Sequence, residues 1–148
     1  MLLAVFLPST EEAMLVRTDY SSDEKWNQLI SLASAPVEDP HPEGQFQASI
    51  RHVTVPDNDG ASVEDFVAAT TEGEPPFFLF VADSTAIQGR EHLLLAVDLL
   101  ENRGATLRVA PNQLWSIENN LSLGNMSFSE FAQAAQDGVY RGFPQVDS

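Results

Sequence analysis

Apolar residues recur along the chain with two different spacings, and these spacings predict which segments are strands. Residues 77–82 are continuously apolar and 92–99 are largely so, as is typical of strands that are covered on both faces of a sheet, and 14–17 form a short, mainly apolar strand. Residues 45–55 and 106–109 alternate between apolar and polar positions, as expected of half-exposed strands. These segments together predict a sheet of about five strands.

Helical spacing appears between and after the strands. Four helices are expected to begin at residues that favour a helix N-terminus: Ser21 with Glu24, Ser62 with Asp65, Pro111, and Ser127 with Glu130. After the first of these, Trp26, Leu29 and Ala33 follow at positions i, i+3 and i+7, which is the apolar stripe of a helix packed on a core. The predicted order of elements is β-α-β-α-β-β-β-α-α.

Two features of the strands bear on topology. Residues 101–104 connect 92–99 to 106–109 too directly for a parallel crossover, so we expect those two strands to be antiparallel neighbours. Within 45–55 the apolar residues change face, which predicts a bulge or a strand end near Arg51 and His52. The expected fold class is α/β, of an α+β-like kind, with a single mixed β-sheet and helices packed on it.

The length of 148 residues fits a single domain spanning 1–148. We expect residues 1–12, which include the apolar run Leu2–Leu7, to form an N-terminal arm, and residues 144–148 to form a flexible tail. No basic residue precedes Arg17, so the start lacks the positive region of a secretory signal. No window approaches the ~20 apolar residues of a membrane span. We therefore expect a cytoplasmic protein with no membrane partner.

Charge narrows the set of partners. The net charge is −15, and residues 1–74 hold 14 acidic and three basic residues, against eight and four in residues 75–148. Such a field repels phosphate backbones, so we expect no nucleic-acid binding. The same field favours a basic protein partner or a cation, although an acidic, well-solvated surface is also common in soluble proteins. The absence of cysteine excludes thiol catalysis and cysteine-based metal sites.

Common catalytic signatures are missing from the chain. It contains no G-x-S-x-G, no G-x-x-x-x-G-K-[ST] and no G-x-G-x-x-G, and its three histidines have neither HxH nor HxxxH spacing. These absences favour a protein that is not an enzyme, and no cofactor is expected.

Three aspartates raise the hypothesis of a metal site. Asp19, Asp83 and Asp98 fall at or near the C-terminal ends of three apolar strands. Ligands of open α/β sheets gather beyond those ends, and Mg²⁺ prefers oxygen ligands. Against this, an antiparallel strand would place its end at the opposite edge of the sheet. Aspartate is also an ordinary turn or helix-capping residue, and we favour that role.

Residues 111–131 combine aromatic and polar side chains more densely than the rest of the chain. The candidate ligand- or partner-binding residues are Trp115, Glu118, Asn119, Asn120 and Asn125, with Arg108 from the preceding strand. Asparagine can donate and accept at once, so these residues often tie a helix end to a neighbouring loop. We favour that structural role. The alternative is a polar pocket or partner surface anchored by Trp115, since tryptophan is enriched at interface hot spots.

Four segments carry a resemblance to a known family. Three of them are 14–29, 76–87 and 93–99, and the fourth, 114–132, reads LWSIENNLSLGNMSFSEFA. The pattern L-W-x-x-E-N-N-L-S-x-x-N-M-x-F-x-x-F-A resembles a bacterial family of cytoplasmic α/β proteins known as a domain of unknown function. The resemblance spans about 14–143 and implies a stand-alone α/β protein. It implies no established activity, cofactor or catalytic residue.

Two functions from different classes remain open. The first is a small non-enzymatic interaction or regulatory module, for example an immunity-like protein, that uses its acidic surface against a basic partner. The second is a small-molecule-binding protein or enzyme with a pocket near Trp115, Asn119 and Asn120 and the strand-end residues Asp83 and Asp98. A closed cleft would favour the second function, and a flat acidic face the first.

Overall fold

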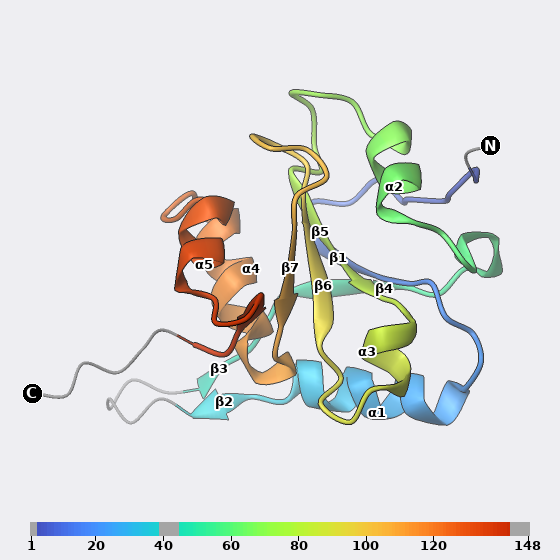
Figure 1. Ribbon diagram of the computed structural model, residues 1–148, viewed down its shortest axis with the longest axis horizontal. Coiled ribbons are helices and arrows are strands. Elements are labelled where there is room, and N and C mark those ends of the chain that lie inside the picture. Colours follow the sequence, from blue (N-terminus) through green and yellow to red (C-terminus); the bar gives the residue numbers. More distant parts are fainter. Residues whose placement is uncertain (1–2, 39–44, 143–148) are drawn as a thin grey trace, which may run out of the picture.

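A central mixed β-sheet organises the computed structural model, which describes residues 3–38 and 45–142 (Figure 1). Its strands lie in the order β4-β1-β5-β6-β7-β8. Their bounds are β1 Ala13–Arg17, β4 Ile50–Val53, β5 Phe78–Ala82, β6 Leu94–Asp98, β7 Thr106–Val109 and β8 Val139–Tyr140. Two short strands, β2 Val37–Glu38 and β3 Gln45–Phe46, form a separate antiparallel pair. The α/β class and the single main sheet are confirmed, with six strands instead of about five.

Helices cover both faces of this sheet. Their bounds are α1 Asp23–Ser34, α2 Val63–Ala69, α3 Ser84–Gln88, α4 Leu114–Ser122 and α5 Phe128–Ala134, with 3-10 turns η1 Pro56–Asn58 and η2 Pro111–Gln113. The larger core cluster joins one face of the sheet to Leu29 of α1, Ile117 of α4 and Phe131 of α5. The smaller cluster joins the other face to Phe66 of α2, so α2 lies opposite α4 and α5 (Figure 1). No helix in the described part of the chain combines the length and apolar character that crossing a membrane requires.

Strand direction separates the two edges of the sheet. β1 is parallel to both β4 and β5, whereas β6 is antiparallel to both β5 and β7. The predicted antiparallel pairing of β6 and β7 is therefore confirmed. Because β6 runs against its neighbours, its last residue, Asp98, pairs with Phe78 at the start of β5. Asp98 thus lies at the edge where β1 and β5 begin.

The start of α1 differs from the prediction by one residue. Ser22, not Ser21, is the N-cap, and its side chain accepts a hydrogen bond from the Lys25 amide at 3.1 Å. The amide of Ser21 instead donates to Asp19 Oδ1 at 2.8 Å. This local turn holds Ser21 outside the helix, so its predicted capping box with Glu24 does not form. The capping boxes predicted at Ser62 and Ser127 are confirmed.

The predicted strand over 45–55 is divided. Residues 45–46 pair with β2, residues 47–49 leave the strand, and β4 begins at Ile50. The change of face predicted a bulge or strand end near Arg51 and His52. The break lies at residues 47–49, just before that position. At this break the amide of Ser49 donates to Glu118 Oε1 of α4 at 2.6 Å, so a residue distant in sequence satisfies the backbone where the strand is divided.

The described part of the N-terminal arm, residues 3–12, lies along η1 and α2. Asn58 is fully buried, and its amide both donates to the Phe6 carbonyl at 2.9 Å and accepts from the Phe6 amide at 2.7 Å. The amide of Leu3 donates to Asp65 Oδ1 at 2.8 Å. Val5 and Leu7 pack against the smaller core cluster. Leu2 and the predicted tail at 144–148 lie outside the described residues.

Candidate functional site

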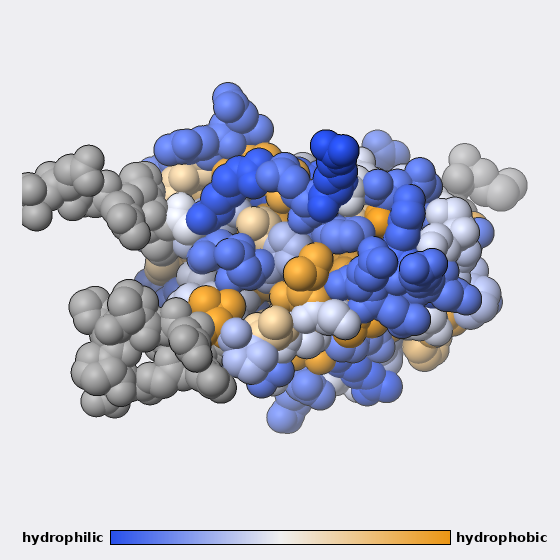
Figure 2. All heavy atoms as spheres, turned by 90° about the horizontal axis from the view of Figure 1, so that it is seen from below, coloured by the Kyte–Doolittle hydropathy of each residue, from blue (hydrophilic) through white to orange (hydrophobic). Residues whose placement is uncertain are grey.

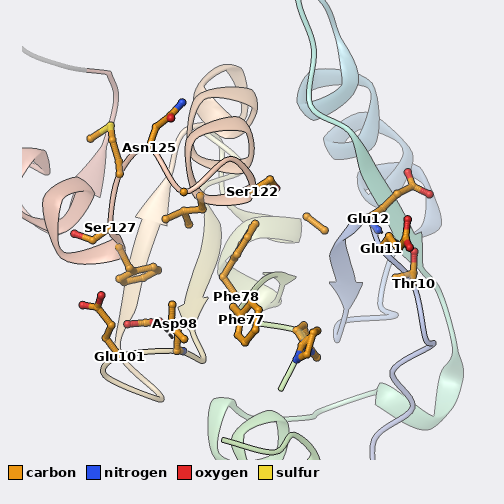
Figure 3. A pocket seen from close by; sticks show the side chains of 18 of the residues that line it. Thr10, Glu11, Glu12, Phe77, Phe78, Asp98, Glu101, Ser122, Asn125 and Ser127 are labelled. Atoms are coloured by element: carbon orange, nitrogen blue, oxygen red, sulfur yellow. Dashed lines mark hydrogen bonds between the residues drawn. The ribbon is translucent and has the colours of Figure 1, made fainter. Parts of the chain in front are cut away.

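The main candidate site is a groove of about 830 Å³ at the edge where β1 and β5 begin and β6 ends (Figure 3). Four separate segments line it: residues 9–13 before and at the start of β1, 75–78 before and at the start of β5, 98 and 100–101 at and after the end of β6, and residues between 121 and 130 around the α4–α5 connection. We call this site the acidic groove. It lies at the end of the sheet where the parallel strands β1 and β5 start. Ligands of α/β sheets commonly bind at the other end, beyond the carboxyl ends of these strands.

Apolar side chains form the floor of the acidic groove. Phe77 and Leu100 are 39% and 49% exposed, so both present apolar surface to the groove. Phe78 lies beside them and meets Phe80 edge to face, with ring centroids 5.7 Å apart. This contact anchors the floor to the larger core cluster. By contrast, the face seen from below, over α1, is mostly hydrophilic with small separate apolar patches (Figure 2).

Every charged residue that lines the acidic groove is acidic: Glu11, Glu12, Asp98, Glu101 and Glu130. Two of these carboxylates serve the fold. Asp98 accepts hydrogen bonds from the amides of Leu100 and Asn102, at 2.9 and 3.1 Å, and Glu130 accepts from the amide of Ser127 at 3.2 Å.

The other three, Glu11, Glu12 and Glu101, are exposed, and their carboxylates make no hydrogen bond or ion pair with another described residue. These three charges are therefore free to meet a ligand.

The structure divides the three aspartates of the metal hypothesis between the two edges of the sheet. Asp19 and Asp83 follow the parallel strands β1 and β5, whereas Asp98 lies at the opposite edge, in the acidic groove. Among the residues that the structure describes, no group of three or more histidine, aspartate or glutamate side chains could hold a metal ion. The hypothesised convergence of the three carboxylates therefore does not occur, because β6 runs antiparallel to β5, as the argument against a metal site in the sequence allowed.

Asp19 and Asp83 are each bound by neighbouring protein groups. Asp19 accepts hydrogen bonds from the Ser21 amide and from Gln88 Nε2, the latter at 2.9 Å. Burial opposes ionisation of Asp19, but the hydrogen bonds from Ser21 and Gln88 outweigh it and lower its pKa to about 2. Asp83 caps α3 and forms a two-point ion pair with Arg108, at 2.8 and 2.7 Å. Arg108 therefore holds β7 against the start of α3.

Of the candidates in the Asn-rich segment, Asn125 lines the acidic groove, and the others do not. Glu118 is buried; besides the Ser49 amide it accepts a hydrogen bond from Ser122 Oγ at 2.9 Å. The Asn120 side chain donates to the Ser116 carbonyl of its own helix at 2.8 Å.

The Asn120 carbonyl accepts from the Asn125 amide at 2.9 Å, which closes the turn after α4. Asn119 is exposed, and Trp115 is half-buried outside the groove.

The residues that distinguish the acidic groove were not among the candidates from sequence. Phe77 was assigned to a strand, but the strand begins one residue later, which leaves this ring at the surface. Glu11, Glu12 and Glu101 appeared only as part of the general negative charge. A run of two prolines before two phenylalanines, at 75–78, was the available signal, since proline lacks the amide that a strand ladder needs and favours a strand that begins after it.

No curated protein matches the chain. Residues 12–143, which include β1 to β8 and α1 to α5, match the profile of a known family. The chain belongs to that family, the domain of unknown function DUF6924.

Proposed function

We propose that this protein is a small non-enzymatic interaction module, and that the acidic groove binds an apolar side chain of a basic protein partner. The observation that carries the proposal is the combination of an exposed apolar floor, formed by Phe77 and Leu100, with a charged lining that is entirely acidic. Charge complementarity selects a partner of opposite sign, and the apolar floor supplies affinity when it is covered.

The magnitudes favour an apolar anchor that is guided by charge. Full burial of a leucine or phenylalanine side chain contributes roughly 1.5–3 kcal/mol. Each exposed ion pair contributes about 0.2–1 kcal/mol, and salt screens it. The anchor therefore supplies most of the affinity. The carboxylates, together with the net charge of −15, supply selectivity and faster association.

The chemistry of the lining supports binding more than catalysis. The hydroxyl groups that line the acidic groove, from Ser9, Thr10, Ser122 and Ser127, have no histidine among the other lining residues to act as a general base. The buried carboxylate of Asp98 is occupied by two backbone amides.

A second candidate is a small organic cation, because about 830 Å³ falls in the range of small-molecule pockets and the charged lining is acidic.

Synthetic peptides that carry one leucine or phenylalanine among lysines test the proposal. We expect binding by calorimetry or fluorescence anisotropy, with the affinity falling as NaCl is raised. Leu100→Ser and Phe77→Ser should weaken binding at least about fivefold, because the floor loses apolar surface. Leu32→Ser is the matched control, since Leu32 is 50% exposed on α1, outside the groove.

The melting temperature of each variant shows whether it remains folded. If the two groove variants are folded and bind like the Leu32 variant, the acidic groove is not the binding site. If no lysine peptide binds while a small aromatic ammonium compound does, the second candidate is correct.

A further inference from the structure

The free carboxylates of the acidic groove lie on two opposite rims. Glu11 and Glu12 form the first rim, just before β1, and Glu101 forms the second rim, in the turn after β6. Figure 3 shows these side chains on either side of Phe77 and Phe78. An occupant that covers the floor is therefore flanked by negative charge on both sides.

Polar contacts within the fold hold each rim in place. In the turn of Glu101, Asp98 binds the amides of both Leu100 and Asn102, and its carbonyl accepts from the Gly104 amide at 2.8 Å. On the first rim, the Glu12 amide donates to Thr10 Oγ1 at 3.1 Å. The arm that leads to this rim is held by the paired hydrogen bonds between Asn58 and Phe6. Both rims are therefore positioned before a partner arrives, which lowers the entropic cost of binding.

We propose that the partner segment carries lysine or arginine on both sides of its apolar anchor. This inference rests on the proposed function and specifies its partner. A segment with basic residues at one end only neutralises one rim and leaves the other rim facing an apolar surface without a counter-charge. A segment with a basic residue at each side of the anchor places a counter-charge at both rims at once. The acidic groove therefore distinguishes peptides of equal charge by the position of their basic residues.

Two peptides of identical composition test the inference. In the first, one lysine lies on each side of a phenylalanine, and in the second, both lysines lie on the same side. Each new exposed ion pair changes affinity by about 1.4- to 5-fold, so the flanked peptide should bind about two- to fivefold more tightly at low salt. Glu101→Gln should lower the affinity for the flanked peptide, so that this variant binds the flanked and the one-sided peptide about equally tightly.

The double variant Glu11→Gln, Glu12→Gln should have the same effect from the first rim. Glu64→Gln is the control, because Glu64 is an exposed glutamate on α2 that does not line the groove. Melting temperatures verify that all variants are folded.

The outcomes separate this inference from the proposed function. The inference is overturned if both peptides bind the wild-type protein equally well and Leu100→Ser lowers the affinity for both. The groove would then bind basic partners whatever the position of their charges. If neither peptide binds, the proposed function fails with it. A preference for the flanked peptide that persists in Glu101→Gln would also overturn the inference, since the second rim would then play no part.

Discussion

At the scale of single residues, several acidic side chains that resemble functional groups in the sequence stabilise the fold. Asp19, Asp83 and Asp98 each accept hydrogen bonds from backbone or side-chain donors close to the end of a strand. Glu118 does the same across a longer distance by binding the Ser49 amide. Removal of one such carboxylate leaves its donors without a partner, and this costs more than the bond itself contributes.

The contribution of the Asp19 carboxylate to stability should depend on pH. Its pKa of about 2 in the folded protein lies below the ordinary value of 3.8. Its ionised form therefore stabilises the fold above pH ~4, and this contribution is lost as the pH falls through about 2. We expect Asp19→Asn to destabilise the protein at pH 7 by about 1 kcal/mol, after allowance for screening by solvent.

The difference in unfolding free energy between this variant and the wild type should shrink as the pH falls from about 4 to 2, which urea or thermal unfolding can follow. A difference that stays constant across this range would mean that the charge of Asp19 does not contribute to stability.

At the scale of elements, helix caps decide where the short helices begin. α2 and α5 span seven residues each, too few to be stable alone, and both begin with a complete capping box. α1 begins one residue later than its sequence suggests because Asp19 binds Ser21. The caps of α2 and α5 thus act locally, whereas the start of α1 depends on a turn that follows β1.

Ser127→Ala tests the cap of α5, which borders the acidic groove. The Ser127 side chain accepts from the Glu130 amide at 3.3 Å, and loss of such a cap costs about 0.5–2 kcal/mol. Asn120→Ala should cost less than about 1 kcal/mol, because its side chain is half-buried and its hydrogen bond among the described residues goes to a carbonyl of its own helix.

Chemical denaturation of both variants, with the exposed Ser31→Ala of α1 as control, measures these differences. If Asn120→Ala proved the more destabilising of the two, its side chain would contribute more than this single bond.

At the scale of the whole molecule, the net charge of −15 affects both partner choice and stability. Like charges repel in the compact state, and salt screens this repulsion over a distance that falls from about 10 Å at 0.1 M to about 3 Å at 1 M. The acidic groove concentrates part of this charge beside an apolar surface. Binding and folding should consequently respond to salt in opposite directions.

We expect the melting temperature to rise by roughly 3 °C between low salt and 0.5 M NaCl, as relief of about 1 kcal/mol of repulsion predicts for a chain of this length. Over the same range, affinity for lysine peptides should fall. Calorimetry measures the first effect and anisotropy the second. Replacing exposed glutamates outside the groove, such as Glu64 and Glu72, by lysine should reduce the salt effect on melting. A melting temperature that falls with NaCl would contradict this account.

Much of the fold could be predicted from the sequence, and the parts that could not share a physical cause. The strands β1, β5, β6 and β7 are long enough for an apolar run or an alternation to be visible. The five-residue helix α3 and the two-residue strand β8 are too short for any periodicity, so neither was predicted. Of the candidate site residues, Asp98 and Asn125 line the acidic groove, but its floor at Phe77 and Leu100 was not foreseen.

The sequence by itself determined the features that depend on neighbouring residues: the apolar strands, the capping boxes at Ser62 and Ser127, and the negative charge. Only the tertiary structure decided which of these distant residues and segments lie next to one another. The antiparallel direction of β6 places Asp98 away from Asp19 and Asp83, and Glu118 binds the backbone at the break in a predicted strand, 69 residues earlier in the chain. The acidic groove exists only because four distant segments come together at one edge of the sheet. Such contacts depend on strand order and direction, which no local pattern encodes.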